Sequence, residues 1–254
     1  MGNNDWLEAK GEFDKDGYTV RRSFLDKAET EDVIENLNRY IKDVIPTVPP
    51  ENAFYEDKED PSTLKQLPHM QAHDPYFDRM LMDSKFRQLA ETLLYGEVVP
   101  KNAQFLCKPP KVGQATPPHQ DGYYFMIDPV EGLTMWLGLD HADEGNGCLR
   151  YVRGSHRKGL RDHSRTQTLG FSQGITDFGT EDDLANEAVY TASPGDLLAH
   201  HALTVHRADA NRSADRPRRA IGFVYLSTRA EERTEDLAQY RSNLAKDLAN
   251  KDRI

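Results

Sequence analysis

The sequence lacks long apolar runs and contains very little cysteine. Within its 254 residues, no stretch approaches the roughly 20 apolar residues that a membrane-spanning helix needs. The opening segment MGNNDWLEAK also lacks the apolar core of a signal peptide. Cys107 and Cys148 are therefore expected to be small buried hydrophobic residues rather than a disulfide. Together these absences predict a cytoplasmic protein.

The sequence has fewer basic than acidic residues. The chain has 32 lysines and arginines against 42 aspartates and glutamates, which gives a formal net charge of -10 at pH 7. Because long-range repulsion would oppose binding to a polyanion, we expect neither a nucleic acid nor a membrane surface as a partner. The expected partner is a small-molecule substrate, and composition leaves the oligomeric state open. The length fits one domain over residues 1–254.

Residues 1–97 are predicted to be mainly helical. A short strand is expected at 18–20, and Thr30 can then cap a helix over 31–45, where apolar residues recur at helical spacing. The stretch that follows is rich in proline and acidic residues, so we expect an exposed loop. Residues 74–96 are predicted to form a helical hairpin with a break between its two helices.

From residue 98 to 228 the pattern changes to short β-rich runs separated by glycine, proline and asparagine turn signals. Such a pattern is typical of a β-sandwich or a jelly roll. Residues 156–187 are polar with little strand pattern, which is typical of a lid or binding loop. The charged residues 229–254 are predicted to form a C-terminal helical tail. The expected strands are 103–108, 123–127, 134–140, 148–152, 188–191, 195–200 and 219–226.

The segment PPHQDGYYF, residues 117–125, holds the strongest chemical signal. It reads as extended, and in a strand residues i and i+2 point to the same face. His119 and Asp121 can therefore grip one metal ion together. A His-x-Asp pair with one remote histidine is the ligand set of non-haem iron(II) oxygenases, which leave other coordination positions open. Alone, the pair is a weak signal, because a surface histidine near an acidic turn residue looks the same.

A second segment, PGDLLAHHALTVH, offers three candidates for the remote histidine: His200, His201 and His206. Strand alternation permits either His201 or His206 as the ligand. The histidines that do not bind metal are expected to be hydrogen-bonded residues of the barrel.

An arginine-rich turn follows these histidines. A cosubstrate such as 2-oxoglutarate can chelate iron through its C1 carboxylate and keto oxygen, and its far carboxylate then needs a fixed cation. Arginine suits this role because its planar fork binds a carboxylate through two bonds and stays charged when buried. Arg218 stands at the head of a predicted strand and is the favoured residue, with Arg216 and Arg219 as competitors.

Over nearly its whole length the chain resembles the phytanoyl-CoA dioxygenase family of Fe(II)- and 2-oxoglutarate-dependent oxygenases. The resemblance is carried in order by FDKDGYTVRRSFL, FLCKPP, PPHQD, MWLGLDHADEGNGCLRYVRGSH, PGDLLAHHALTVH and the N-x-S and P-R-R-A-I of ANRSADRPRRAI. It implies a double-stranded β-helix, the cupin-like jelly roll, with helices packed outside. It also implies Fe(II), 2-oxoglutarate and O2 as cofactor and cosubstrates.

The resemblance assigns residues as well. It implies His119, Asp121 and His206 as the iron ligands. For the cosubstrate it implies Arg218 as the partner of the far carboxylate, Trp136 as a wall of the pocket, and Lys65 as a residue that reaches 2-oxoglutarate.

Some positions depart from the family pattern. Gln104 stands where relatives often have a methionine in the cosubstrate pocket, and Ala208 where a serine often helps to bind the far carboxylate. The interval from His206 to Arg218 is also one residue longer. These departures concern the hydrogen bonds to 2-oxoglutarate. Asp121 is retained, whereas halogenating relatives have a small residue there, so hydroxylation is expected rather than halogenation.

A basic cluster within residues 156–187 suggests a substrate. If Arg157 and Arg161 bind it, the substrate carries a carboxylate, phosphate or phosphonate group. The alternative is a solvated loop whose charges balance nearby acidic residues. Tyr123 and Tyr124 follow the predicted ligands and are candidates for the same pocket.

Two other functions stay open at this point. A non-catalytic jelly-roll protein could bind a metal or a small molecule, because a fold alone does not establish an activity. A cupin-like dioxygenase could work without a keto acid, in which case Arg218 would be structural. The leading prediction is a dioxygenase that hydroxylates a small organic substrate.

Overall fold

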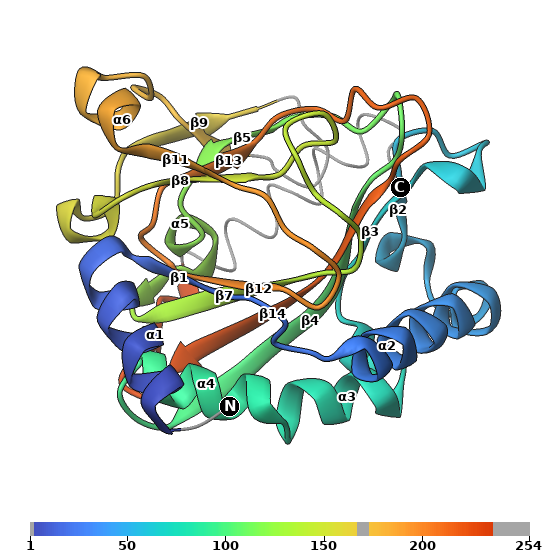
Figure 1. The fold of residues 1–254 in the computed structure, drawn as a ribbon, viewed down its shortest axis with the longest axis horizontal. Helices are drawn as coiled ribbons and strands as arrows, with labels where there is room; N and C mark the ends of the chain where they lie inside the picture. The colour runs from blue at the N-terminus through green and yellow to red at the C-terminus, as the bar shows by residue number, and fades with distance from the viewer. Residues whose placement is uncertain (1–2, 167–172, 236–254) are drawn as a thin grey trace.

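Two antiparallel β-sheets face each other, and helices cover the outer side of the larger one (Figure 1). The computed structural model describes residues 3–166 and 173–235. Within these residues, a seven-stranded sheet has the order β1-β12-β7-β14-β4-β3-β2 and a four-stranded sheet has the order β11-β8-β13-β5. Separate ladders join β9 to β10 and β6 to β15. The predicted jelly roll is confirmed.

The first four strands belong to the larger sheet, and from β5 onward the chain crosses repeatedly between the two sheets. The larger sheet contains β1 (Tyr18–Arg21), β2 (Phe54–Tyr55), β3 (Leu64–Leu67), β4 (Val98–Lys108), β7 (Gly132–Gly138), β12 (Leu197–His201) and β14 (Arg218–Ser227). The smaller sheet contains β5 (Thr116–His119), β8 (Leu149–Val152), β11 (Glu187–Tyr190) and β13 (His206–Ala208). The separate ladders are β6 (Ile127–Asp128) with β15 (Glu231–Glu232), and β9 (His163–Arg165) with β10 (Gln173–Ile175).

The N-terminal helices lie beneath the larger sheet in Figure 1. They are α1 (Asn3–Asp16), α2 (Lys27–Arg39), α3 (Pro75–Met82) and α4 (Lys85–Leu93). Two short helices, α5 (Gly122–Phe125) and α6 (Glu181–Asn186), belong to connections of the β-rich part.

Side-chain alternation separates the core under the helices from the space between the sheets. On β7, Leu133, Met135 and Leu137 belong to the core cluster of the helices, whereas Trp136 belongs to the cluster between the sheets. Phe86 of α4 packs on β14, with its ring centroid 4.5 Å from that of Phe223. One face of each central strand therefore holds the helices, and the other is free to line a pocket.

The helix predicted over 31–45 begins earlier, because Asp26 rather than Thr30 caps it. The Asp26 carboxylate accepts the backbone N–H of Glu29 at 2.9 Å, and the Glu29 carboxylate accepts the backbone N–H of Asp26 at 2.8 Å. This reciprocal capping box satisfies two free donors at the helix start. The predicted helical hairpin is confirmed, and Ser84 caps its second helix.

The N-terminal part is not purely helical, because it supplies both edges of the larger sheet. The strand predicted at 18–20 is confirmed as β1 and pairs with β12. At the other edge β2 pairs with β3, and β3, which was not predicted, pairs with β4. Leu64 and Lys65 are buried in succession there, so the alternation by which a strand is recognised in sequence is missing.

The strand predicted over 123–127 is wrong. The extended chain of β5 ends at His119, and Asp121 starts the helical turn α5 with φ -60° and ψ -30°. At Gly122 the chain passes so close to its surroundings that a Cβ would lie 2.5 Å from a methyl carbon of Val130. A tight turn, rather than strand alternation, therefore brings Asp121 beside His119.

The lid candidate 156–187 is described in part. It contains the β9–β10 ladder and α6, while residues 167–172 lie outside the described residues. Of the predicted C-terminal tail, β15 joins β6, and residues 236–254 lie outside. In the described ranges no helix has both the length and the apolar character to cross a membrane. That residues 1–254 form one domain stays a prediction.

Candidate metal centre and its pocket

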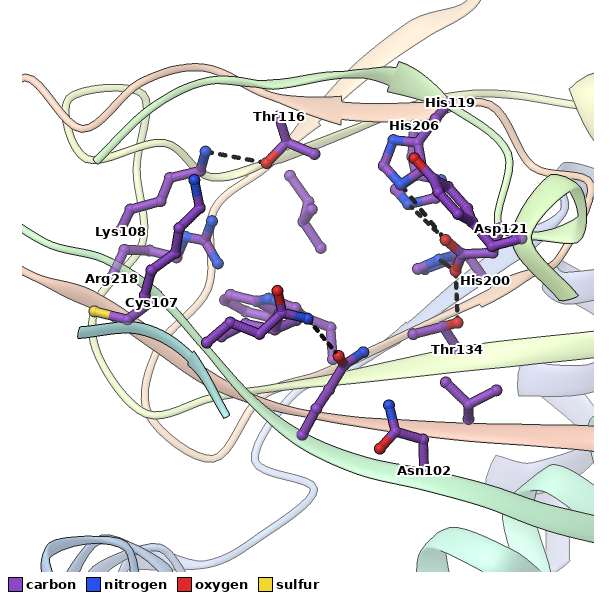
Figure 2. A pocket seen from close by; sticks show the side chains of 18 of the residues that line it. Asn102, Cys107, Lys108, Thr116, His119, Asp121, Thr134, His200, His206 and Arg218 are labelled. Atoms are coloured by element: carbon purple, nitrogen blue, oxygen red, sulfur yellow. Dashed lines mark hydrogen bonds and ion pairs between the residues drawn. The ribbon is translucent and has the colours of Figure 1, made fainter. Parts of the chain in front are cut away.

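Two histidines on neighbouring strands face each other beside an aspartate (Figure 2). His119 of β5 and His206 of β13 are directly opposed in their ladder. Their Nε2 atoms lie 3.5 and 3.8 Å from Oδ1 of Asp121, and one donor atom from each residue falls within 4.8 Å of the others. The alternative ligand, His201, lies elsewhere, with its ring centroid 5.8 Å from that of Phe13 in α1.

A backbone carbonyl selects the tautomer of each histidine. Nδ1 of His119 lies 2.8 Å from the Pro117 carbonyl, and Nδ1 of His206 lies 3.0 Å from the Thr204 carbonyl. A carbonyl oxygen only accepts hydrogen bonds, so each Nδ1 carries a hydrogen, and in the neutral imidazole Nε2 is then the nitrogen with the lone pair. Burial above all, and then the neighbouring histidines, lowers the pKa of His206 well below its usual value. Neutral imidazole is the form that binds a metal.

Asp121 presents one oxygen to these histidines and the other to two donors. Its Oδ2 accepts a hydrogen bond from the Thr134 hydroxyl at 2.5 Å and lies 3.0 Å from Nε2 of His200. Burial opposes ionisation, but the surrounding histidines outweigh it and hold the pKa of Asp121 well below its usual range. An ionised carboxylate and two neutral imidazoles are the donor set of open non-haem iron(II) centres. The residues present therefore fit ferrous iron.

A cavity of about 230 Å³ connects this donor set to a group of cations. Alternation along β4 directs Asn102, Gln104 and Lys108 into the cavity. The register between β4 and β14 places Asn102 beside Val224 and Lys108 beside Arg218. The histidines and Asp121 lie at one end and the cations at the other (Figure 2).

Arg218 is a buried cation, and no carboxylate of the described residues pairs with it. The residue is 5% exposed, and its Nε has no hydrogen-bond partner within those residues. The guanidinium carbon lies 5.4 Å from the ring centroid of Trp136, within range of a cation–π contact. Burial lowers the pKa of Arg218 to about 10, which still leaves the side chain charged at neutral pH.

The competing arginines are engaged elsewhere. Arg216 pairs with Asp143 at 2.8 Å, and both side chains are largely exposed. Arg219 pairs with Asp140 at 2.8 Å. Alternation along β14 turns Arg219 away from its neighbour Arg218. Arg218 is thus the arginine of this turn that lines the cavity.

The other residues implied for the cosubstrate, Lys65, Gln104 and Trp136, also line the cavity. Nζ of Lys65 lies 3.0 Å from a carboxylate oxygen of Glu56. The side-chain carbonyl of Gln104 accepts a hydrogen bond from the Gln66 amide at 3.0 Å. The indole nitrogen of Trp136 is buried without a partner in the described part of the chain.

Lys108 is a further cation, which the sequence analysis missed. Its Nζ donates to the Gln114 carbonyl and to the Thr116 hydroxyl, the latter at 3.1 Å. Burial above all, and then the charge of Arg218, lowers the pKa of Lys108 well below its usual value. Strand alternation from Gln104 would have identified Lys108, since residues separated by an even number share a face.

Of the two tyrosines proposed for the substrate, Tyr124 lines the cavity. Its ring stands edge-on to His119 with centroids 5.9 Å apart, and its hydroxyl donates to the Gln173 carbonyl at 2.8 Å. Tyr123 is not part of the lining. Its ring stacks on His163 instead, with centroids 4.4 Å apart.

Arg157 and Arg161 are not brought to the cavity. Arg161 pairs with Asp177 and Asp183, each at 2.8 Å. Arg157 donates to the carbonyl of Lys15, near the end of α1, at 2.6 Å. The contacts of Arg161 match the alternative interpretation of the basic cluster, in which nearby acidic residues balance its charge.

Gln120, between the two ligands of the His-x-Asp motif, is a further residue that the sequence analysis missed. It is fully buried. Its amide nitrogen donates to the carbonyls of Gly159 and Leu203 at 2.9 and 2.7 Å, and its oxygen accepts the backbone N–H of Arg161 at 2.8 Å. No sequence pattern marks this residue, because its partners are backbone groups of two distant loops.

Comparison with known proteins identifies the family. The family model described as Phytanoyl-CoA dioxygenase (PhyH) matches residues 13–220. The chain belongs to the phytanoyl-CoA dioxygenase family. The resemblance seen in the motifs is therefore confirmed.

Relatives of the chain share part or most of its length. A Caenorhabditis elegans protein named phytanoyl-CoA dioxygenase domain-containing protein 1 homolog is 32% identical over 146 residues, covering 55% of this chain and 51% of that protein. A Stutzerimonas stutzeri protein named probable alpha-ketoglutarate-dependent hypophosphite dioxygenase is 25% identical over 218 residues, covering 84% of this chain and 76% of that protein. The chain spans about half the length of the curated phytanoyl-CoA dioxygenase relatives that it matches.

A solved structure supports the fold. The crystal structure of the epimerase SnoN, in complex with Fe³⁺, alpha ketoglutarate and nogalamycin RO, has a TM-score of 0.73 at 22% identity. The match covers 91% of this chain and 87% of that one. At this identity the likeness concerns the fold.

Proposed function

We propose that this protein is an Fe(II)- and 2-oxoglutarate-dependent dioxygenase that hydroxylates a small organic substrate. In this reaction one atom of O2 enters the substrate and the other enters succinate, while the C1 carboxylate of 2-oxoglutarate leaves as CO2. One observation carries the proposal: a single cavity joins a two-histidine, one-carboxylate donor set to Arg218, which has no carboxylate partner among the described residues.

His119, Asp121 and His206 would hold the iron, which supplies the centre where dioxygen is activated. The three side chains are already oriented as metal ligands by contacts within the protein. Carbonyls keep both imidazoles in the tautomer that binds a metal, and the carboxylate of Asp121 is ionised. Little side-chain rearrangement is then needed when the metal enters.

Arg218 would bind the far carboxylate of 2-oxoglutarate through its planar fork. The other cations of the cavity have protein partners: Lys65 pairs with Glu56, and Lys108 donates to a backbone carbonyl and a hydroxyl. Trp136 would supply a wall beside the cosubstrate. In the same proposal Lys65 reaches the cosubstrate, and Gln104 lines the cavity that holds it.

The two alternatives explain less of the cavity. A dioxygenase without a keto acid would leave Arg218 as a structural cation, but a buried structural charge is normally paired. The neighbouring Arg219 has such a partner in Asp140. A non-catalytic binding protein would likewise have no need for both a complete donor set and a free buried cation. The retained Asp121 favours hydroxylation over halogenation.

A cavity of about 230 Å³ favours a small substrate, in line with the hypophosphite named for the Stutzerimonas stutzeri relative. The formal net charge of -10 supports a small-molecule partner rather than a nucleic acid or a membrane surface. We place the activity in the cytoplasm, as the sequence analysis expects.

Anaerobic absorption spectroscopy tests the proposal. When Fe(II) and then 2-oxoglutarate are added to the metal-free protein, we expect the weak visible charge-transfer band of a chelated keto acid. His206→Ala should lose this band. The matched variant His201→Gln, which alters a histidine outside the donor group, should keep it. Iron binding without a band would refute the use of 2-oxoglutarate and favour the cupin-like alternative.

A further inference from the structure

The aspartate of the proposed metal centre is held by two residues of the larger sheet. Thr134 of β7 and His200 of β12 are directly opposed in the ladder of these strands. The Thr134 hydroxyl lies 2.5 Å, and Nε2 of His200 3.0 Å, from Oδ2 of Asp121. The other oxygen, Oδ1, is the one nearest to His119 and His206. Thr134 and His200 therefore contact Oδ2, whereas His119 and His206 lie nearest to Oδ1.

A third residue, Tyr151, contacts the His200 ring on the side away from Asp121. The ionised carboxylate of Asp121 only accepts hydrogen bonds, so Nε2 of His200 carries the hydrogen of this contact, and the other ring nitrogen is Nδ1. The hydroxyl of Tyr151 lies 3.1 Å from that Nδ1 and can donate to it. Tyr151 is fully buried. Tyr151 and Asp121 therefore contact the two ring nitrogens of His200, which fixes the orientation of the imidazole.

We infer that Thr134 and His200 are positioning residues that hold Asp121 as a one-oxygen metal ligand. With Oδ2 occupied by two donors, Oδ1 is the oxygen available on the side of His119 and His206. A carboxylate that offers one oxygen leaves more coordination positions open than one that offers two. The inference rests on the proposed function, because it requires a metal at this site, and adds the residues that orient the carboxylate.

The arrangement also links the ligand to the fold. Asp121 follows β5 of the smaller sheet, whereas both donors belong to central strands of the larger sheet. Thr134 and His200 are 7% and 3% exposed, so water does not compete effectively for Oδ2. The spacing between the two sheets therefore sets how the carboxylate faces the histidines.

Binding of Co(II) tests this inference without turnover. Isothermal titration of the metal-free protein measures affinity, and the visible d–d spectrum reports coordination geometry. Thr134→Val and His200→Phe each remove one donor, and each is expected to weaken Co(II) binding by about 10- to 100-fold. The spectrum should also change, because the carboxylate can then turn its second oxygen toward the metal. Thr134→Ser keeps the hydroxyl and should restore native affinity.

His201→Gln is the matched control, since His201 is adjacent on β12 but lies against α1 rather than in the cavity. It should bind Co(II) as the native protein does. Thermal unfolding of the metal-free variants shows whether each is folded. If His200→Phe does not fold, Tyr151→Phe replaces it, because this change removes only the hydroxyl that contacts Nδ1 of His200 and should weaken binding several-fold.

The outcomes separate the two proposals. Native affinity and a native spectrum in Thr134→Val and in the folded His200 or Tyr151 variant would refute the positioning role and leave the proposed function intact. A native protein that binds no Co(II) would refute both. A loss of thermal stability with unchanged Co(II) affinity would show that the contacts are structural only, which also overturns the inference.

Discussion

Replacing Arg218 with methionine should stabilise the metal-free protein and weaken its binding of 2-oxoglutarate. Burial lowers the pKa of Arg218 from its usual value to about 10, and one pKa unit corresponds to about 1.4 kcal/mol, so burying the charge costs about 3 kcal/mol. Losing the guanidinium contact with Trp136 offsets about 1–2 kcal/mol of the gain. Arg218→Met should therefore raise the free energy of unfolding by about 1–2 kcal/mol.

The effect on the cosubstrate has the opposite sign. Removing one partner of a buried charge pair costs about 2–5 kcal/mol of binding free energy, so the dissociation constant of 2-oxoglutarate should rise at least about 30-fold. Urea unfolding of the metal-free protein measures the first effect. Anaerobic titration of the Fe(II)-loaded protein with 2-oxoglutarate, followed by the charge-transfer band, measures the second.

Arg219→Met is the matched control, because Arg219 neighbours Arg218 but pairs with Asp140. It should lower the free energy of unfolding by at most about 1 kcal/mol, as expected for a partly exposed ion pair, and leave 2-oxoglutarate binding unchanged. An Arg218→Met protein that is less stable than native and binds 2-oxoglutarate with native affinity would refute the reasoning.

Three further changes test other parts of the structure. Gln120→Glu sets a carboxylate against the two carbonyls that the amide now donates to, and should lower the free energy of unfolding in urea by about 3 kcal/mol; a loss below about 1 kcal/mol would contradict this. Burial above all, and then the charge of His156, lowers the pKa of His201 from 6.5 to about 4. Because only the unfolded chain binds this proton between these values, stability should fall as the pH decreases from about 6.5 to about 4. His201→Gln should flatten that part of the urea-derived stability curve, and an unchanged slope would exclude His201 as the cause. Gly222→Ala places a Cβ 3.2 Å from Cγ of Gln104 and should displace Gln104; an unaltered affinity for 2-oxoglutarate would show that Gln104 takes no part in binding.

The sequence alone determined the class of fold and the short set of candidate ligands. Strand propensity, turn residues and the His-x-Asp motif depend on neighbours in the chain, so they are visible without a structure. The reason given for the motif was nevertheless wrong. Strand alternation was expected to bring His119 and Asp121 together, whereas a tight turn at Gly122 does so. The same residues therefore meet through a different local geometry.

Tertiary structure decided the choices that alternation left open. Alternation shows which residues share a face of a strand, but strand pairing decides which face meets the cavity. The pairing of β5 with β13 opposes His119 and His206, and His201 faces α1 instead. In the same way the register of β14 with β4 turns Arg218 toward the cavity beside Lys108.

The hydrogen-bond partners of the metal ligands could not be predicted from the sequence either. Thr134 and His200, which hold Asp121, come from strands 13 and 79 residues further along the chain and from the opposite sheet. The carbonyls that fix the histidine tautomers and hold Gln120 are backbone groups, which every residue carries. Local sequence thus determined which side chains were present, and the packing of the two sheets determined which of them act together, because hydrogen bonds between distant strands depend on their positions in space.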